Sequence, residues 1–321
     1  MKTYLVTGGA GFIGSHLVDA LLENGCYVKV YDNFSTGSIK NLAHLITSEN
    51  SKLEIFHGDI RDSDKLSNAL VGVHGVFHLA ALVSVPQSIE EPNISFDINS
   101  KGTQLVLNEA RKLNLGRVVI ASSAAVYGDC QNVPLTETEE TTPLSPYGLD
   151  KLIGEQLGRL YSSLYGMNVS CMRFFNVFGP RQPPDSPYSG VVSIFANKAS
   201  INQSPSIFGE GDQTRDFVFV QDVVAALVNA MNSTLPGFRV YNVGTGRGIT
   251  IAELWDIFRK IAQSDVKPEY QPARLGDIKN SVADATLIKT ELNFSPSVCI
   301  EDNLFDTYKW SLGRIKQPVA K

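Results

Sequence analysis

The stretch Thr7–His16 reads TGGAGFIGSH and decides the fold of this 321-residue chain. An apolar run over Lys2–Thr7 precedes it and predicts a short buried strand, and apolar residues follow it at helical spacing, at Leu17, Val18, Leu21 and Leu22. Its glycines satisfy both GxGxxG and GxxGxxG spacing, which permits a tight turn and a close approach of backbone N–H groups to a pyrophosphate at the start of a helix. The stretch therefore predicts a strand–turn–helix unit that binds a dinucleotide, with a ligand-free unit as the alternative.

An acidic residue completes this dinucleotide pattern. The next predicted strand, Tyr27–Tyr31, ends in Asp32, eighteen residues after Gly14. A carboxylate at this place can accept hydrogen bonds from both ribose hydroxyls of NAD, and it would repel the 2′-phosphate of NADP. No arginine follows directly, so we expect NAD rather than NADP as the cofactor.

Strand-like and helical segments alternate after this unit, which is typical of a doubly wound parallel sheet. Further strands are predicted at Leu53–Phe56, Val73–Leu79, Arg117–Ala121 and Asn168–Arg173, and long helices at Ser95–Leu113 and Pro146–Tyr165. Beyond Arg173 the sequence becomes richer in Pro, Gly and irregular segments. We therefore expect an α/β fold, a Rossmann-type doubly wound parallel sheet built from residues 1–172 plus about 217–244, with a smaller C-terminal substrate domain built from about 173–216 plus 245–321.

The composition argues against several classes of protein. A net charge of −5 without a basic stripe predicts no binding to nucleic acid or to anionic membrane surfaces. No apolar run reaches membrane-spanning length, and the chain enters a strand directly at its start, which predicts no signal peptide. His74 and His78 fall within one predicted strand, so no metal site is expected. Scattered cysteines predict reduced thiols and a cytoplasmic protein; they are Cys26, Cys130, Cys171 and Cys299.

A second group of residues carries the chemistry. Tyr147 and Lys151 are four residues apart and share one face of a predicted helix. A free tyrosine has a pKa of about 10, and a nearby ammonium, like an oxidised nicotinamide ring, favours its phenolate. Ser122 and Ser123 follow the strand Arg117–Ala121, at the edge where ligands bind in open α/β sheets. Serine, tyrosine and lysine together can remove a proton from a substrate alcohol while hydride leaves for a nicotinamide.

Other residues fit a bound dinucleotide or its substrate. Asp59 follows the third predicted strand, where its carboxylate can reach the adenine amino group, and the small residues Ala80 and Ala81 let a cofactor lie against the backbone. Arg215 and Arg274 lie in predicted loops that contain glycine. A bidentate grip on a diphosphate is one interpretation of these arginines, and a surface ion pair is the other.

Five motifs of the chain resemble those of the extended short-chain dehydrogenase/reductase family, most closely its UDP-sugar 4-epimerases. They are TGGAGFIGSH at Thr7–His16, SSAAVYGD at Ser122–Asp129, YGLDK at Tyr147–Lys151, RFFNVFGPR at Arg173–Arg181 and TRDFVFVQDV at Thr214–Val223. The resemblance covers nearly the whole chain. It implies a Rossmann domain that holds NAD, a smaller domain that holds a UDP-sugar, and a homodimer in which the helices Ser95–Leu113 and Pro146–Tyr165 form a four-helix bundle.

The resemblance also assigns roles to single residues. The catalytic residues would be Ser123, Tyr147 and Lys151. The NAD-binding residues would be Gly8, Gly11, Phe12, Ile13, Gly14, Asp32, Asn33, Asp59, Ile60, Leu79, Ala80, Ala81, Ser122, Tyr147, Lys151, Phe174 and Val177. The substrate-binding residues would be Ser84, Ser123, Tyr147, Asn176, Val191, Arg215, Arg274, Asp277 and Ser281. Among these, the two arginines would grip the diphosphate, and the resemblance implies no metal ligand.

Two absences separate the chain from other branches of this family. Sugar 4,6-dehydratases carry Asp-Glu directly after the catalytic hydroxyl residue and UDP-glucuronate decarboxylases carry Glu two positions after it, whereas this chain has Ala124 and Ala125. The resemblance therefore implies a reversible oxidation at C4, in which Tyr147 takes the 4-OH proton while hydride passes to NAD. The 4-keto sugar would turn in the site and regain the hydride on its other face, so that NAD serves as a tightly held prosthetic group.

The sugar is indicated by two departures from a strict UDP-galactose 4-epimerase. Val83 stands where those enzymes often carry Lys, and Ala81–Pro86 is more similar to UDP-N-acetylhexosamine 4-epimerases. Ser281 stands where a bulky aromatic residue restricts relatives to non-acetylated sugars, and a serine leaves room for an acetamido group. We expect UDP-GlcNAc and UDP-GalNAc as substrates, with UDP-Glc and UDP-Gal as secondary ones.

Two alternatives remain at this point. One is a UDP-glucuronate 4-epimerase or another nucleotide-sugar-modifying enzyme of the same family. The other is an NAD-binding regulator without redox activity on the same fold, although such proteins commonly lose the Tyr or Lys that this chain retains.

Overall fold

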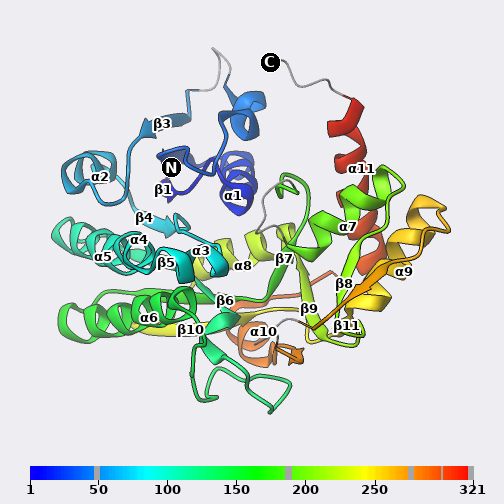
Figure 1. Cartoon of the computed structure of the whole chain (residues 1–321). Coiled ribbons are helices and arrows are strands. Elements are labelled where there is room, and N and C mark those ends of the chain that lie inside the picture. The colour runs from blue at the N-terminus through cyan, green and yellow to red at the C-terminus, as the bar shows by residue number, and fades with distance from the viewer. Residues whose placement is uncertain (47–50, 185–189, 274–277, 298, 317–321) are drawn as a thin grey trace.

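The protein was analysed as a computed structural model that describes residues 1–46, 51–184, 190–273, 278–297 and 299–316. Its centre is a seven-stranded parallel sheet in the order β10-β6-β5-β4-β1-β2-β3, with helices on both faces (Figure 1). The strands are β1 (Thr3–Thr7), β2 (Tyr27–Asp32), β3 (Leu53–His57), β4 (Gly75–His78), β5 (Arg117–Ser123), β6 (Val169–Phe174) and β10 (Phe238–Val243). The expected Rossmann-type, doubly wound sheet is thereby confirmed.

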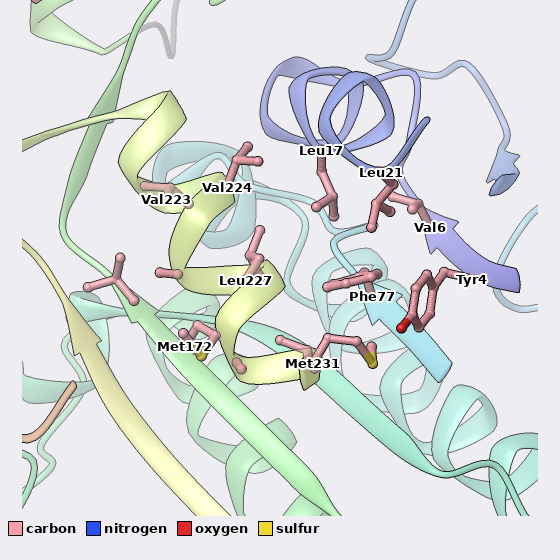
Figure 2. Packing of buried hydrophobic residues seen from close by; sticks show 14 of the residues in the cluster. Tyr4, Val6, Leu17, Leu21, Phe77, Met172, Val223, Val224, Leu227 and Met231 are labelled. Atoms are coloured by element: carbon pink, nitrogen blue, oxygen red, sulfur yellow. The ribbon is translucent and has the colours of Figure 1, made fainter. Parts of the chain in front are cut away.

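The helices on the two faces follow from the alternation of side chains along the strands. On one face, Tyr4, Val6 and Phe77 pack against Leu17 of α1 (Phe12–Glu23) and Leu227 of α8 (Val220–Asn232), as Figure 2 shows. On the other face, the intervening strand residues pack against α2 (Ser63–Leu70), α5 (Gly102–Lys112) and α6 (Pro146–Tyr165). Because both faces are covered, the central strands are apolar almost throughout.

Most predicted bounds differ from the structure by one or two residues; strand β4 begins at Gly75, so His74 lies outside it, and two further elements differ in ways that affect the predicted site. Strand β5 runs two residues further than predicted, so Ser122 and Ser123 are its last residues. The predicted helix Ser95–Leu113 consists of α4 (Pro92–Phe96), a π-helical turn η2 (Asp97–Lys101) and α5. The wide turn accompanies side-chain bonds of Ser95, Asn99 and Ser100 to neighbouring segments, which periodicity alone does not reveal.

A smaller group of strands and helices lies beside the carboxyl ends of the large sheet (Figure 1). Its four-stranded sheet contains β7 (Asn176–Phe178), β9 (Thr214–Phe219), β11 (Gly248–Thr250) and β13 (Asn280–Ser281), and β8 (Ser206–Phe208) pairs with β12 (Glu269–Gln271). Its core lies under α7 (Val191–Ser200), α9 (Ile251–Ala262) and α11 (Ile300–Lys316). The remaining short elements are η1 (Ile39–Leu45), α3 (Val85–Glu90), η3 (Ala124–Tyr127) and α10 (Thr286–Leu292).

The described residues lack two features that would suggest other kinds of protein. None of their helices combines the length and the apolar character needed to cross a bilayer. No group of three or more His, Cys, Asp or Glu side chains in the same residues is arranged to hold a metal ion. His74 accepts a hydrogen bond from the backbone N–H of Thr3, and His78 lies in the core.

Candidate active site

The glycine-rich loop leaves no space for side chains. Gly8 has a φ of +71°, and a Cβ atom there would lie 2.7 Å from the backbone nitrogen of Ala80. A Cβ on Gly14 would lie 2.1 Å from the carbonyl oxygen of Gly8. Gly11 is the N-cap of α1 and provides no side-chain cap, so the first N–H groups of the helix remain available to an anion. This loop fits the pyrophosphate of a dinucleotide.

Acidic side chains lie at the ends of the next two strands. Asp32, at the end of β2, is buried, and its carboxylate accepts hydrogen bonds from the backbone N–H groups of Ala10 (2.9 Å) and Phe34 (2.8 Å). Asp59 follows β3 and accepts from Asn33 (2.9 Å). Two bonds of 2.8 Å from the Arg61 guanidinium hold the pKa of Asp59 well below its usual range. The predicted NAD residues Asp32, Asn33 and Asp59 thus lie along one side of the loop. The carboxylates of Asp32 and Asp59 can accept hydrogen bonds from hydroxyl or amino groups of a bound dinucleotide.

The end of β4 is held against β1 by a buried histidine. The His78 ring lies between the hydroxyls of Thr7 (2.8 Å) and Thr103 (3.0 Å). Burial, and then the charge of Lys151, lowers the pKa of His78 to about 3, so its ring is neutral. Further along the chain, the side-chain amide of Asn99 forms two hydrogen bonds with the backbone of Leu82. Its oxygen accepts from the Leu82 N–H (2.9 Å), and its nitrogen donates to the Leu82 carbonyl (3.0 Å). These bonds fix the backbone of Leu79, Ala80 and Ala81 beside Gly8.

Ser123, Tyr147 and Lys151 come together at the carboxyl end of β5. The Lys151 ammonium donates to the carbonyl of Ala121 (2.9 Å) and lies 5.7 Å from the centroid of the Tyr147 ring. Burial raises the pKa of Tyr147, and a hydrogen bond with Ser123 opposes that rise. Burial disfavours the charged form of Lys151 and lowers its pKa to about 8, although nearby Asp150 favours that charged form. The predicted base and its two partners therefore form one half-buried group.

The start of α6 fixes Tyr147 within this group. Ser145 caps the helix by accepting from the N–H of Gly148 (3.1 Å), and Pro146 occupies its first turn. The backbone N–H of Tyr147 donates to Ser88 of α3 (3.1 Å). A Cβ on Gly148 would lie 2.7 Å from the carbonyl oxygen of Ala125, so glycine allows the helix to pack closely on the turn that follows Ser123.

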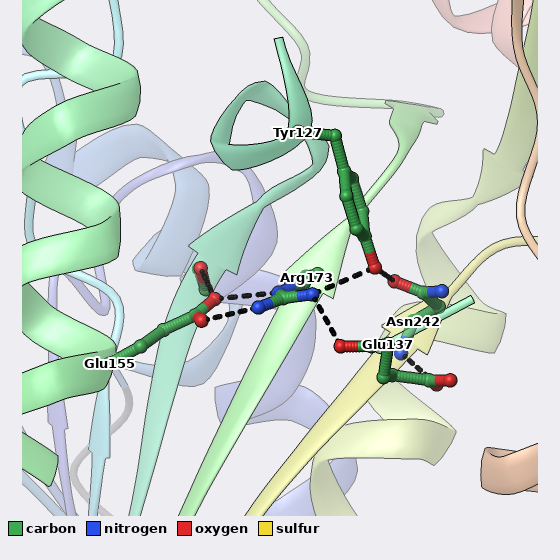
Figure 3. A network of polar contacts seen from close by, with 6 residues as sticks. Tyr127, Glu137, Glu155, Arg173 and Asn242 are labelled. Carbon is green, nitrogen blue, oxygen red and sulfur yellow. Dashed lines mark hydrogen bonds and ion pairs between the residues drawn. The ribbon is translucent and has the colours of Figure 1, made fainter. Parts of the chain in front are cut away.

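A buried polar network lies near the predicted catalytic group, on the strands β5, β6 and β10 and the helix α6 (Figure 3). Arg173 of β6 forms a double ion pair with Glu155 of α6, with Nε–Oε1 at 2.9 Å and Nη2–Oε2 at 2.7 Å. Ser122 donates to the same carboxylate (2.5 Å), and Arg173 also donates to the Tyr127 hydroxyl (2.9 Å). Tyr127 in turn donates to Asn242 of β10 (2.6 Å). The network ties three strands of the sheet to the helix that carries Tyr147, with its charges paired and hydrogen-bonded as burial requires.

The predicted diphosphate arginine and sugar residue meet in the smaller sheet. Arg215 of β9 and Ser281 of β13 are register partners. Ser281 is 9% exposed, and Arg215 is half-buried, with its guanidinium donating to the carbonyl of Thr214 (2.9 Å). Next to Arg215, the buried carboxylate of Asp216 accepts from the N–H groups of Thr245 (2.8 Å) and Gly246 (2.9 Å) and others, which fixes β9.

The structure places most of the remaining predicted residues, and two of them lie outside the described part of the chain. Phe12 and Ile13 begin α1, Ile60 is buried against Gly102, Asn176 and Val177 form β7 next to Phe174, and Val191 begins α7. Ser84 is buried and caps α3, where its hydroxyl accepts from Gln87. Arg274 and Asp277 lie outside the described residues.

Sequence reasoning missed several residues that shape the site. They are Arg61, Ser88, Asn99, Asp150, Glu155 and Arg173, and most of them act through partners far away in the chain. One signal was available for Glu155, because it lies four residues after Lys151 and therefore on the same side of the helix. Nothing local indicates that its partner is Arg173.

Comparison with known proteins gives consistent results. The family model described as GDP-mannose 4,6 dehydratase matches residues 5–307. A UDP-glucose 4-epimerase of Mycolicibacterium smegmatis is 38% identical over 314 residues, which cover 97% of this chain and 98% of the relative.

Two solved structures are also similar along nearly the whole chain. A UDP-N-acetylglucosamine 4-epimerase from Methanobrevibacter ruminantium M1, in complex with UDP-N-acetylmuramic acid, has a TM-score of 0.93 and 37% identity, covering 98% of this chain and 99% of that one. The UDP-glucose 4-epimerase of Thermus thermophilus, in complex with NAD, has a TM-score of 0.87 and 33% identity, covering 97% and 99%.

Proposed function

Since the chain belongs to the extended short-chain dehydrogenase/reductase family, among its UDP-sugar 4-epimerases, we propose that it interconverts UDP-GlcNAc and UDP-GalNAc. At the coarser level it is a UDP-sugar 4-epimerase that uses NAD. The proposal rests on one observation above all, the half-buried group of Ser123, Tyr147 and Lys151 at the carboxyl end of β5. Ala124 and Ala125 follow it and provide no acid for elimination.

Each residue of the site has its own role in the proposed reaction. NAD, which the glycine loop and Asp32 would hold, would supply the hydride-transfer chemistry at C4. The Tyr147 oxygen takes the proton of the 4-OH and later gives it back. The hydroxyl of Ser123 holds the phenol oxygen by a hydrogen bond, and the ammonium of Lys151 favours its ionised form.

Two residues, Ser281 and Val83, support an N-acetylated sugar as the substrate. Ser281 is a small residue on the strand next to Arg215, so a diphosphate held by Arg215 would bring the attached sugar close to it. Val83 is 65% exposed just before α3 and provides no cation there. A serine at this place would leave more room for the acetamido group at C2 than an aromatic residue, and its hydroxyl could bond that group.

We also propose which part of the chain binds NAD and which part binds the nucleotide sugar. We assign NAD to residues 1–172 plus about 217–244, and the nucleotide sugar to about 173–216 plus 245–321. Strand β10 is an edge strand of the large sheet and α8 packs on α1, which supports placing both with the NAD-binding part. Strand β9 belongs to the small sheet and ends at Phe219, so the expected boundary at about 217 falls inside this strand, and the chain crosses between the parts at the start of α8.

A panel of UDP-sugars tests the substrate. Purified protein is incubated without added NAD with UDP-GlcNAc, UDP-GalNAc, UDP-Glc, UDP-Gal and UDP-glucuronate, and the products are separated by chromatography. We expect the highest kcat/KM for the acetylated pair, a lower value for the glucose pair and no epimerisation of UDP-glucuronate. Turnover of UDP-glucuronate alone would replace the proposed substrate by the first alternative.

A further inference from the structure

The turn that follows strand β7, residues 179–182, contains a strained backbone conformation. Arg181 has a φ of +68°, in the left-handed region that favours glycine. In the same turn, the N–H of Gln182 donates to the carbonyl of Gly179 (3.4 Å). A Cβ on Gly179 would lie 2.6 Å from the side chain of Val220, so the turn packs closely on the start of α8. A strained residue of this kind persists only where contacts with other elements hold it in place.

Helix α1 provides two of these contacts. The guanidinium of Arg181 pairs with the carboxylate of Asp19 (Nη2–Oδ2 2.8 Å), and the two side chains are 21% and 19% exposed. Three residues before Asp19, the buried ring of His16 lies with Nε2 2.9 Å from the carbonyl oxygen of Pro180. A carbonyl oxygen only accepts, so Nε2 carries the proton, and Nδ1 of the neutral ring accepts from the amide of Gln221 (3.2 Å).

The last residue of the turn contacts the elements before and after it in the chain. The side-chain nitrogen of Gln182 donates to the carbonyl of Val177 in β7 (3.1 Å). The same nitrogen lies 3.0 Å from the place of a Cβ on Gly190, the N-cap of α7, so it rests against the start of that helix. The proposed site places Asn176 and Val177 in β7 and Val191 at the start of α7. The turn therefore joins α1, which begins at the glycine loop, to two elements that carry proposed binding residues.

We propose that Arg181 is a positioning residue for substrate binding. Together with Asp19 and His16, it holds the 179–182 turn in its strained conformation and thereby keeps β7 and the start of α7 in the arrangement that binds the UDP-sugar. Arg181 touches neither the substrate nor the cofactor in this account. This role rests on the proposed function and adds to it the residues that shape the substrate site from α1.

The effect of the turn on binding follows from the populations of its conformations. Without the contacts from α1, part of the molecules relax the strained residue, and the apparent affinity for the substrate falls by the fraction that remains competent. Saturating substrate draws all molecules back to the competent conformation, so kcat keeps its value. The contact therefore affects KM and not kcat.

Two substitutions of Arg181 separate the ion pair from the strain. Arg181→Ala loses the pair and keeps the strain, so we expect a rise of about fivefold in KM, the upper end for an ion pair of this exposure. Arg181→Gly also loses the pair, but glycine adopts a φ of +68° without strain. Relief of the strain offsets most of the loss, so the rise should be about twofold or less.

The test uses the holoenzyme and two measurements. Titration calorimetry with UDP gives a Kd that needs no turnover, and steady-state epimerisation of UDP-GlcNAc gives KM and kcat. Asp19→Asn removes the charge on the other side of the pair and should match Arg181→Ala, while the double variant should be no worse than either single one. His44→Ala is the matched control, because it removes the second partner of Asp19 (2.8 Å) at a side chain that is 50% exposed. It should leave Kd, KM and kcat unchanged.

The outcomes decide between positioning and other roles. Equal losses in Arg181→Ala and Arg181→Gly would show that the strained backbone does not matter, as for an arginine that binds the substrate directly, and would overturn the proposal. So would an unchanged Kd in both, which an ion pair that only stabilises the fold would give. If Arg181→Ala does not fold, Asp19→Asn supplies the same comparison with Arg181→Gly. UDP binding without turnover in the unaltered protein would refute the proposed function and leave the Kd comparison standing, whereas absence of UDP binding would refute both.

Discussion

The proposed reaction requires Tyr147 to lose a proton in a place where burial makes ionisation harder. Burial raises its pKa, and the hydrogen bond from Ser123 opposes that rise. Lys151 lies 5.7 Å from the ring centroid and is itself only partly stable as a cation, because burial lowers its pKa to about 8. The positive nicotinamide ring would add a second charge, which couples formation of the base to binding of the oxidised cofactor.

Replacing the proposed base tests this assignment. Tyr147→Phe keeps the ring and removes only the hydroxyl, so it should fold and bind UDP-sugar but lose roughly 10²–10⁴-fold in kcat, the usual range for a missing general base. Ser123→Ala should lose less, because Tyr147 can still reach the substrate directly or through water. Near-normal turnover by Tyr147→Phe would show that the proton leaves by another route.

The side chain at position 281 is expected to set the range of sugars. Ser281→Tyr would fill the space that an N-acetyl group needs, and overpacking of about 1–3 kcal/mol corresponds to roughly 5- to 200-fold in relative kcat/KM. The acetylated pair should therefore lose far more than UDP-Glc and UDP-Gal when all four are measured in both proteins. A uniform loss would mean that the tyrosine damages the fold, and no loss for the acetylated pair would mean that Ser281 does not face the sugar.

At the scale of elements, the contact between α6 and the sheet decides where the proposed catalytic residues lie. The Arg173–Glu155 pair and Ser122 join α6 to β5 and β6, and Tyr127 extends the contact to Asn242 in β10 (Figure 3). The pair is nearly inaccessible to water, with side chains 5% and 3% exposed. Loss of one partner would therefore leave an uncompensated charge in the core.

This contact leads to a stability prediction. Arg173→Met should lower the free energy of unfolding by about 3–5 kcal/mol, because Glu155 remains buried without its partner. The double variant Arg173→Met, Glu155→Leu should recover much of that loss, since neither charge remains. Urea unfolding of the four proteins in the cycle measures both effects. A loss below about 1 kcal/mol for the single variant would show that water or another group compensates Glu155.

The sequence predicts those elements whose signals are local. Six strands of the large sheet, the helix Pro146–Tyr165 and the glycine loop follow from hydrophobic period, capping residues and glycine spacing, whereas the strand β10 was not predicted. The π-helical turn at Asp97–Lys101 could not be predicted, because the side chains that accompany it bind Leu82 and Asp150 elsewhere in the chain. The partner of Arg173 and the pairing of Ser281 with Arg215 depend on register between distant segments, which a single sequence does not specify.

At the scale of the whole molecule, apolar side chains remain exposed along one pair of helices. On α6 they are Leu149, Leu160, Leu164 and Tyr165, and near it on the chain segment Pro92–Leu113 they are Ile94, Phe96 and Leu113. An apolar surface of this kind on a protein of this size is typical of an interface. We propose that two copies pair these helices into a four-helix bundle, as the resemblance implies.

Charged residues on this surface should separate the copies. The double variant Leu160→Glu, Leu164→Glu changes side chains that are 50% and 62% exposed, so the single copy should still fold while the proposed dimer dissociates. Light scattering after gel filtration measures the mass. Val71→Glu, at a residue that is 60% exposed outside these helices, is the matched control and should remain a dimer. A monomeric unaltered protein, or a double variant of unchanged mass, would contradict the proposed interface.

The most direct test of the whole account follows the hydrogen at C4 of the sugar. UDP-GlcNAc carrying deuterium at C4 is converted by the purified protein without added NAD, and the product is analysed by mass spectrometry and NMR. If Tyr147 moves only the hydroxyl proton and the hydride returns from the cofactor to the same molecule, the product is UDP-GalNAc with deuterium retained at C4. Absence of UDP-GalNAc, or a product whose C4 hydrogen comes from the solvent, would contradict the account.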